Sequence, residues 1–367
     1  MEENEPKREE TKKETDKKCP SCGGVMDFNP GNGTLACPYC GHEEQIPVTK
    51  EEQTRVNEKD FDKAETLENS DWGAEKKSII CKSCGAESVY DSNQLANECP
   101  YCGSNQVMEE KSKGTGMAPD GVCPFVIDFK KAGENFSKWL KGDFFCPEQA
   151  KKKAKPSSFK GVYIPFWTFD VDTYSQYRGE YGIDRKVKDG DTTRTVTDWH
   201  KVSGHYGKFF DDLPVCASNR YNKNMLKELE PFDTEHCKHY KPEYVAGYVA
   251  EKYTVGLKDG WNVHGKKRIH DVLEDKICER IRQVHHADHA RVSHFDTEYF
   301  NLKYKYLLLP IWLSSFKFQD KIYNFMVNGQ TGKVAGEKPV DWLKVTLVVL
   351  GFILLCWLFF SITGGGD

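Results

Sequence analysis

The chain lacks an excess of charge of either sign, and we expect it to have no signal peptide. Its 367 residues include 52 Lys and Arg against 56 Asp and Glu, which gives a formal net charge of −4. This balance provides no general attraction to nucleic acid or to anionic lipid. Residues 1–18 mix acids and bases without any apolar stretch, which argues against a signal peptide and predicts a solvated, disordered tail.

The sequence also lacks the short motifs of common enzyme classes, with no Walker A loop, nucleophile elbow or dinucleotide fingerprint. The segment NGQTGKV at 328–334 does not have the spacing of a phosphate loop and instead predicts a β-hairpin turn. Two groups of side chains have the chemistry to ligate a metal or transfer protons: His236, Cys237 and His239, and His285, His286 and His289. His285 and His289 would share one face of a helix. Neither group has further partners, so solvated or capping roles are favoured and no enzyme activity is expected.

Cysteine, by contrast, is plentiful, and eight of the 14 cysteines form two tetrads with one spacing, C-x2-C-x14-C-x2-C. The tetrads are Cys19, Cys22, Cys37 and Cys40, and Cys81, Cys84, Cys99 and Cys102. Disulfides or redox-active pairs would not explain two tetrads of equal internal spacing. Two C-x-x-C pairs on facing hairpins can supply four thiolates to one tetrahedral ion. The spacing therefore predicts two structural zinc ions in two small rubredoxin-like zinc ribbons.

Glycine follows the second cysteine of each pair, at Gly23, Gly24, Gly41, Gly85 and Gly103. At such positions the chain must often take positive φ so that backbone amides point at sulfur. All four thiolates of a set are used by the metal, so no coordination position is open for catalysis. Each ribbon has only about 28 residues, too few to bury a core without its metal.

The two ribbons contain almost no cations. Residues 19–46 have no Lys or Arg but three acids, and residues 78–108 have only Lys82 against three acids. Binding of phosphate needs clustered cations. The sequence thus argues against nucleic acid as a partner, and a membrane-tethered, nucleic-acid-associated zinc-ribbon factor is kept as the alternative function.

One long apolar run, VTLVVLGFILLCWLFFSI, occupies residues 345–362 without a charge. As a helix it would measure about 27 Å, close to the hydrocarbon thickness of a bilayer. A buried core helix is the alternative, but apolar residues occupy every face. Lys333, Lys338 and Lys344 precede the run and no Lys or Arg follows it. We therefore predict a single-pass transmembrane helix over 342–363, tail-anchored in the cell membrane, with the N-terminal domains in the cytoplasm.

Composition divides the chain into successive units. The predicted organisation is a tail (1–18), zinc ribbon 1 (19–46), a charged linker (47–77), zinc ribbon 2 (78–108), a linker (109–120), an α+β domain with an internal repeat (121–340), the transmembrane helix (342–363) and a tail (364–367). The charged linker predicts that the ribbons move relative to each other. Five further cysteines look unpaired and suit a reducing cytosol: Cys123, Cys146, Cys216, Cys237 and Cys278.

The internal repeat of the main domain is an echo between FKGVYIPFWTF at 159–169 and YKYLLLPIWLS at 304–314. Each copy leads into alternating segments with turn signals, which predict antiparallel meanders. A proline inside each strand predicts an edge or a bulge. A further strand is predicted at 123–129, and helical spacing predicts helices at 130–142, 222–232 and 266–290. The fold class is therefore α+β, with a β-rich duplicated domain.

This combination of motifs resembles a known group of bacterial membrane proteins. The paired CPYCG ribbons, the YIPFW segment, YLLLPIW followed by FMVNGQTGKVAGEKP, and the apolar span resemble proteins described as TFIIB-type zinc-ribbon-containing or primosomal-helicase-like. The resemblance covers most of residues 19–362 and carries over only the eight ribbon cysteines. A helicase would need a nucleotide-binding loop, which this chain lacks.

The resemblance implies a role in envelope stress or membrane maintenance. It also implies flotillin-like SPFH proteins and phage-shock-protein-A-like proteins as partners. We therefore expect a cytoplasm-facing, membrane-anchored adaptor that recruits or scaffolds partner proteins and has no catalytic residues.

Overall fold

The computed structural model describes residues 17–49, 54–64, 76–81, 87–91, 107–110, 117–154, 156, 159–189, 192–319 and 321–363. For 76–81, 87–91, 107–110, 189 and 358–363 only the backbone is described. The helices are α1 (Phe129–Lys141), α2 (Glu148–Lys153), α3 (Lys223–Leu229), η3 (Pro242–Val245), α4 (Leu257–Asp259), η4 (Gly260–Gly265), α5 (Lys266–His285) and α6 (Trp342–Thr363). The strands are β1 (Asp27–Asn29), β2 (Thr34–Ala36), β3 (Glu43–Glu44), β4 (Lys59–Asp60), β5 (Lys76–Cys81), β6 (Glu87–Asp91), β7 (Val107–Glu110), β8 (Gly121–Val122), β9 (Lys160–Asp189), β10 (Thr192–Cys216), β11 (Lys238–His239), β12 (Val249–Glu251), β13 (His289–Phe318), β14 (Lys321–Asn328) and β15 (Val334–Gly336).

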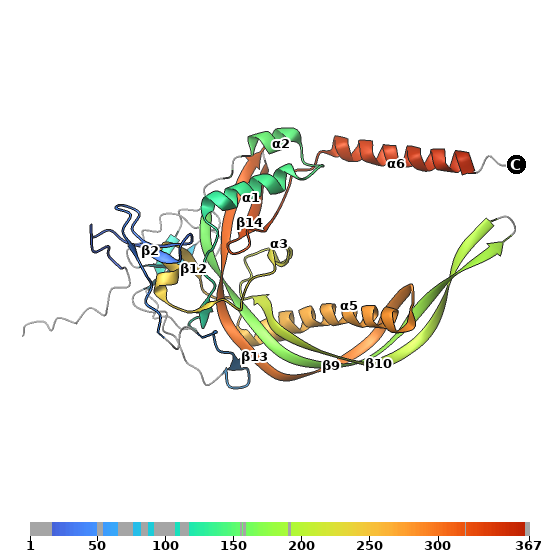
Figure 1. Ribbon diagram of the computed structural model, residues 1–367, viewed down its shortest axis with the longest axis horizontal. Coiled ribbons are helices and arrows are strands. Elements are labelled where there is room, and N and C mark those ends of the chain that lie inside the picture. The colour runs from blue at the N-terminus through green and yellow to red at the C-terminus, as the bar shows by residue number, and fades with distance from the viewer. Residues whose placement is uncertain are drawn as a thin grey trace, which may run out of the picture.

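Three long antiparallel strands, β9, β10 and β13, form the centre of the fold (Figure 1). β9 lies between the other two and pairs with each along most of its length. The sheet curves, and α5 lies along its concave side (Figure 1). The buried side chains of α5 recur every four residues and form one apolar stripe toward the sheet: Ile269, Leu273, Ile277 and Ile281. The class is α+β and rich in β structure, as predicted.

The two copies of the internal repeat, at 159–169 and 304–314, are called the aromatic–proline segments below. They lie side by side, because residues 160–169 of β9 pair antiparallel with 304–313 of β13. On its other side, the segment of β9 pairs first with β12, in parallel, and then with β10, antiparallel. The segment of β13 pairs first with β8, in parallel, and then with β14, antiparallel. Positions with equivalent neighbours are 145 residues apart, which is also the offset of the sequence echo. These positions are Val162 and Leu307, Tyr163 and Leu308, and Phe166 and Ile311.

Pro165 and Pro310 lie in strands with neighbours on both sides, and the pairing of β9 with β13 has no register shift at either proline, so the prediction that they mark an edge or a bulge is wrong. Each lies at the point where one neighbouring strand ends and the next begins, between β12 and β10 or between β8 and β14. There no neighbour requires the N–H group that proline lacks. Their carbonyls still accept hydrogen bonds, from the N–H of Ala217 and of Gly329, both at 2.9 Å.

Trp167 and Trp312 also occupy equivalent environments on one face of this sheet. Trp167 is fully buried, and its indole N–H donates to the carbonyl of Val255 at 2.9 Å. Trp312 donates in the same way to the carbonyl of Ile127 at 2.8 Å. Each indole also contacts an aromatic ring two residues before that carbonyl, with centroids 5.2 Å apart for Tyr253 and 4.7 Å apart for Phe125.

Both faces of the sheet are covered at this point. The period-two geometry of a strand directs Trp167 to one face and Phe166 to the other. The first face packs under α1, where the ring of Phe136 stacks on Phe325 at 4.0 Å. The second face packs under α3, whose Leu226 and Leu229 are buried with Phe166. The two aromatic–proline segments thus form the centre of a three-layer core.

The predicted helices are confirmed as α1, α3 and α5, but α5 is shorter than predicted. It ends at His285 because His286 takes a left-handed conformation with φ of 50°. His289 begins β13, so His285 and His289 do not share a helix face. The prediction of a strand at 123–129 is wrong, since these residues form no strand up to the start of α1 at Phe129 and the two-residue strand β8 ends just before them, at Gly121–Val122.

Part of the segment predicted as a charged linker packs on the folded unit around the central sheet, which is called the body below. β4 pairs antiparallel with Lys303 and Tyr304 of β13. The ring of Phe61 lies 6.3 Å from each of three buried rings: Phe169, Trp261 and Tyr304. The idea of a free linker is therefore wrong for residues 54–64.

Strands from the predicted zinc ribbon 2 extend the central sheet. β6 pairs with β12, and β5 pairs with both β6 and β7. Cys81 is the last residue of β5. The other three cysteines of this tetrad, Cys84, Cys99 and Cys102, lie outside the described residues. The second zinc site therefore stays a prediction.

Helix α6 forms where the sequence predicts the membrane span, and it projects away from the body (Figure 1). Within the part of the chain that the structure describes, no helix has both the length and the apolar character needed to cross a bilayer. The predicted transmembrane helix is therefore not confirmed. The predicted tails, apart from Lys17 and Lys18, lie outside the described residues.

Candidate metal centre

Four cysteines meet at one end of a small antiparallel sheet of order β1–β2–β3. One C-x-x-C pair precedes β1 and the other lies between β2 and β3. The four sulfur atoms lie within 4.8 Å of one another. The Sγ atoms of Cys19 and Cys40 are 3.4 Å apart, and those of Cys22 and Cys37 are 3.5 Å apart. The structure thus brings together the first predicted tetrad.

The two C-x-x-C turns have the same backbone geometry. In the first, the N–H of Gly23 donates to the carbonyl of Cys19 at 2.8 Å, and in the second Gly41 donates to Cys37 at 2.9 Å. Gly23 has φ of 76° and Gly41 has φ of 75°, a conformation that strains other residues. This confirms, for the two pairs of ribbon 1, the prediction that glycine is needed after the second cysteine.

The four thiols of the tetrad oppose one another's ionisation, which favours binding of a cation. Burial raises the pKa of the Cys19 thiol, but the N–H groups of Ser21 and Cys22, with the neighbouring thiols, outweigh it and lower the pKa to about 6. For Cys40, the N–H of His42 lowers the pKa, but the Cys19 and Cys22 sulfurs outweigh it and raise the pKa to about 12. A first thiolate therefore opposes ionisation of the others. A bound cation would allow all four to ionise.

Zinc fits this donor set. In a tetrahedral site with Zn–S bonds of about 2.3 Å, neighbouring sulfurs are about 3.8 Å apart, close to the distances seen here. Cys19 and Cys37 are buried, while Cys22 and Cys40 are exposed. The set can bind one zinc ion and, with four protein ligands, would leave it no open position.

Ribbon 1 packs directly on the body. The N–H of Phe28 donates to the carbonyl of Ala246 at 3.1 Å, and its ring lies 5.9 Å from that of Tyr244. Gly247 has φ of 80°, and a Cβ there would lie 2.7 Å from Cγ of Asp27. The buried side chains of the ribbon belong to the same apolar cluster as those of the body. The expectation that this ribbon moves freely is therefore wrong for residues 17–49.

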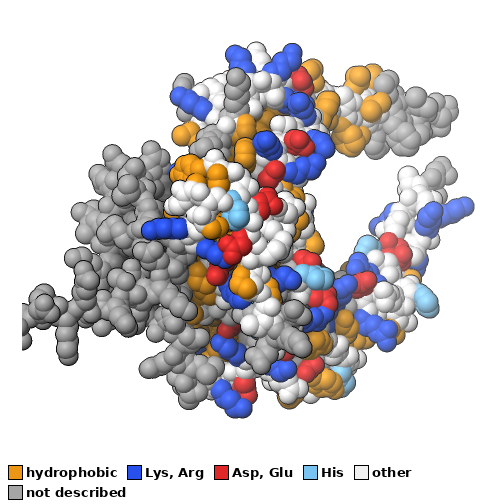
Figure 2. Space-filling view, turned by 60° about the vertical axis from the view of Figure 1, so that its left-hand side comes forward, with side chains coloured by type: hydrophobic (Ala, Val, Ile, Leu, Met, Phe, Trp, Pro, Cys, Tyr) orange, Lys and Arg blue, Asp and Glu red, His pale blue; other side chains and the backbone are white. Residues whose placement is uncertain are grey.

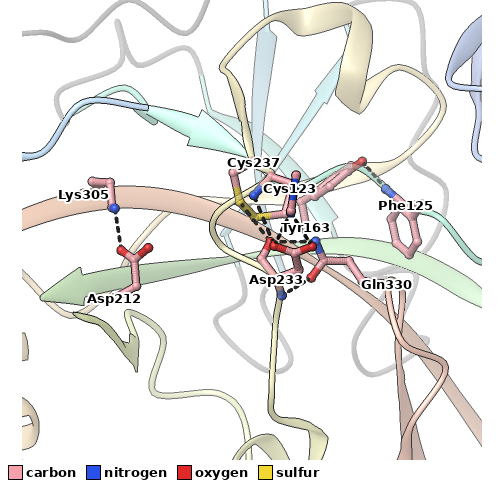
Figure 3. The surroundings of a disulfide bond; sticks show 9 residues. Cys123, Phe125, Tyr163, Asp212, Asp233, Cys237, Lys305 and Gln330 are labelled. Atoms are coloured by element: carbon pink, nitrogen blue, oxygen red, sulfur yellow. Dashed lines mark hydrogen bonds and ion pairs between the residues drawn. A yellow bond between two sulfur atoms is a disulfide. The ribbon is translucent and has the colours of Figure 1, made fainter. Parts of the chain in front are cut away.

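Two cysteines predicted to be unpaired, Cys123 and Cys237, instead form a disulfide (Figure 3). They are 114 residues apart, and the bond joins the end of β8 to the segment before β11. The turn after β14 holds the same segment, because the side chain of Gln330 exchanges two hydrogen bonds of 3.0 Å with the backbone of Asp233. Cys146, Cys216 and Cys278 are free thiols, as predicted.

The histidine groups do not form sites. The ring of His236 lies 2.8 Å from a carboxylate oxygen of Asp233, and Cys237 is in the disulfide. The ring of His285 stacks on Tyr181, with centroids 4.2 Å apart. Among the described residues, no group besides the first tetrad brings three or more metal-ligating side chains together. The predicted solvated or capping roles fit His236, whose side chain is exposed, and His286, which is the C-cap of α5, whereas the stacking of His285 was not predicted.

A buried charged cluster that the sequence did not indicate lies around Asp170 of β9. Register shifts in β10 and β13 bend the sheet on either side of it. Its Oδ1 accepts from the N–H of Asp212 at 2.7 Å, and Nζ of Lys305 lies 2.6 Å from Oδ1 of Asp212 (Figure 3). Burial, together with a hydrogen bond to Glu58, raises the pKa of Asp170 to about 7.

Asp170→Asn is expected to remove a pH-dependent part of the stability. An unfolded Asp ionises near about pH 4, whereas Asp170 in the folded protein stays protonated up to about pH 7. The free energy of unfolding therefore falls as pH rises through this window. Relative to the parent, the variant should gain about 3–4 kcal/mol between pH 4 and pH 8, since the pKa of Asp170 in the folded protein lies about three pH units above that of an unfolded Asp.

Urea unfolding of both proteins across this range measures the effect, and taking their difference cancels the pH dependence of the zinc site. Asp211→Asn, at the exposed neighbour, is the matched control. A difference that stays constant with pH would show that Asp170 is ionised in the folded protein.

Comparisons with known proteins support the assignment of the first tetrad to a zinc ribbon. No family model matches the chain, and no solved structure matches it. The chain is a homologue of the uncharacterized protein YdjG of Bacillus subtilis strain 168, with 29% identity over 328 residues, which is 89% of this chain and 91% of the relative. It is also 33% identical over 88 residues to transcription factor S of Methanocaldococcus jannaschii, which is 24% of this chain and 67% of that protein. The four-cysteine site of ribbon 1 resembles the zinc ribbon of this second protein.

Proposed function

We propose that the protein is a zinc-ribbon adaptor that holds partner proteins at the membrane and has no catalysis of its own. The observation that carries the proposal is the fixed position of ribbon 1, whose inner side packs on the body while its outer side exposes Tyr39. This side chain is 79% exposed and lies in the second C-x-x-C turn. Exposed aromatic residues on rigid elements are typical anchors of protein interfaces.

The remaining parts of the proposal come from the sequence. The apolar run at 345–362 and the lysines before it favour a single-pass anchor with the ribbons facing the cytoplasm. The second tetrad favours a second structural zinc ion, and the echo of 145 residues favours a duplicated β unit. The resemblance described above favours SPFH or flotillin-like and phage-shock-protein-A-like proteins as partners.

A second candidate is a nucleic-acid-associated factor tethered to the membrane, which the similarity to transcription factor S favours. The charge of ribbon 1 argues against it. Lys17 and Lys18 precede the first cysteine, but Lys17 pairs with Glu44 and residues 19–46 contain no Lys or Arg. A ribbon that contacts phosphate would need several free cations.

Affinity purification of the full chain from its native membrane in mild detergent, followed by mass spectrometry, tests the adaptor. SPFH-like or phage-shock-like proteins should be enriched. Tyr39→Ala should reduce their recovery at least about tenfold, because truncation of an interface anchor costs more than about 1.4 kcal/mol. Phe209→Ala, on the exposed surface of β10, is the control, and unchanged zinc content shows that ribbon 1 is intact.

Equal recovery with Tyr39→Ala and with the parent would exclude this surface as the contact. Recovery of nucleic acid in place of protein, with retention that falls steeply as salt rises, would transfer the assignment to the second candidate.

A further inference from the structure

Positive charge is concentrated in the α1–α2 corner, residues 129–154. This segment has seven lysines against three carboxylates, a formal charge of +4 in a chain whose total is −4. Figure 2 shows Lys and Arg side chains gathered at the top of the molecule, over α1 and α2. The neutral overall composition therefore conceals a local basic surface.

The fold directs these lysines to solvent and leaves most of them unpaired. The apolar stripe of α1, with Ala132, Phe136 and Leu140 buried, holds the opposite side of the helix outward. Lys131 and Lys151 pair with acids within the corner, Glu134 and Glu148. Five further exposed lysines have no carboxylate partner among the described residues: Lys130, Lys138, Lys141, Lys152 and Lys153.

Large apolar side chains are exposed beside the lysines. Phe144 and Phe145, in the loop between α1 and α2, are 63% and 39% exposed, and their rings are 5.3 Å apart. Trp342 and Leu343, in the first turn of α6, are more than 70% exposed. Exposed aromatics flanked by lysines are typical of surfaces that enter the headgroup layer of a membrane.

Hydrogen bonds fix this loop to the start of α6. The N–H of Asp341 donates to the carbonyl of Phe145 at 2.8 Å. Nζ of Lys344 donates to the carbonyls of Phe144 and Cys146, each at 3.1 Å. The exposed rings of the loop therefore lie at the level of the first turn of α6, where an anchored helix would leave the bilayer.

We propose that the α1–α2 corner is a docking surface for anionic lipid. Phe144 and Phe145 enter the headgroup layer, and the five unpaired lysines lie against lipid phosphates. This rests on the membrane part of the proposed function and adds the lipid class to it. Because the surface is fixed to α6, lipid contact would also set the orientation of the body on the membrane. Each lysine near an anionic surface strengthens partitioning about fivefold, so three of them contribute on the order of 100-fold.

The test uses the full chain reconstituted with vesicles of phosphatidylcholine alone, or of phosphatidylcholine and phosphatidylglycerol in equal parts. Vesicle flotation reports anchoring, and amide hydrogen exchange over residues 142–154 reports the corner. Exchange there should be at least about tenfold slower on the anionic vesicles, and added salt should restore it. Lys141→Gln, Lys152→Gln and Lys153→Gln together should abolish this protection.

The matched control is the triple variant Lys186→Gln, Lys188→Gln and Lys201→Gln, which removes the same charge from the exposed β9–β10 hairpin and should keep the protection. Flotation with both vesicle types but equal exchange in the corner would overturn the lipid surface and leave the anchor intact. Flotation with neither vesicle type would overturn both the lipid surface and the membrane anchor. Protection that appears only when an acidic protein partner is added would reassign the corner to protein binding.

Discussion

Removal of zinc from ribbon 1, by a chelator or by Cys37→Ser, is expected to unfold residues 17–49 and to loosen the body next to them. Structural zinc in small ribbons contributes about 10–16 kcal/mol, which matches or exceeds the whole stability of a typical domain. The metal-free ribbon cannot compensate, because its four cysteines lose the cation that holds them together.

The loss should extend into the body because the apolar core is continuous across the contact. Phe28 packs on Tyr244, and Asp27 lies against Gly247. Amide exchange should therefore accelerate in residues 17–49 and also in 244–247. Metal analysis should show one zinc ion fewer per chain.

Cys278→Ser is the control for this experiment, because it removes a free thiol from α5, a helix remote in sequence from ribbon 1. It should change neither the zinc content nor the exchange of residues 17–49. Acceleration confined to the ribbon would show that the body does not depend on it. An unchanged zinc content with Cys37→Ser would show that the metal is held elsewhere.

Trp167→Ala is expected to destabilise the protein by about 3–5 kcal/mol, the usual cost of removing a fully buried indole. The ring is completely buried, and its centroid lies 4.9 Å from that of Tyr306. A Cβ added at Gly260 would lie 2.7 Å from the indole, so little free space surrounds it. Urea unfolding followed by circular dichroism measures the loss.

Two further variants separate the effect of burying the ring from the effect of the indole hydrogen bond and from the effect of removing any tryptophan. Trp167→Phe keeps an aromatic ring but leaves the carbonyl of Val255 without its donor, which should account for about 1–3 kcal/mol. Trp199→Ala is the exposed control and should stay within about 0.5 kcal/mol of the parent. If Trp167→Ala cost no more than Trp199→Ala, Trp167 would not belong to the stabilising core.

Features that depend on neighbours in the chain could be predicted from the sequence. The C-x-x-C spacing and the glycines at 23 and 41 specify the turns that bring four sulfurs together, because each turn is closed by its own backbone. The same holds for α1 and α5, whose apolar residues recur with helical period. The hairpin at 328–334 also followed from local turn residues, and in it the N–H of Gly332 donates to the carbonyl of Asn328 at 2.8 Å.

Features that join distant segments could not be predicted in this way. Nothing near Cys123 or Cys237 indicates that they meet, since 114 residues separate them and either fits a reduced thiol equally well. The proline rule also failed at Pro165, because a strand can have interior and edge character at successive residues when its neighbours change.

The sequence by itself determined the metal-ligating set of ribbon 1, the helices and the two copies of the aromatic–proline segment, since these depend on spacing along one stretch of chain. Tertiary structure alone decided that ribbon 1 is fixed to the body, that Asp170 is buried among charges, and that the loop carrying Phe144 is fixed to the start of α6. The physical reason is that burial and charge density are properties of surfaces that meet in space, and the segments that form these surfaces are far apart in the chain.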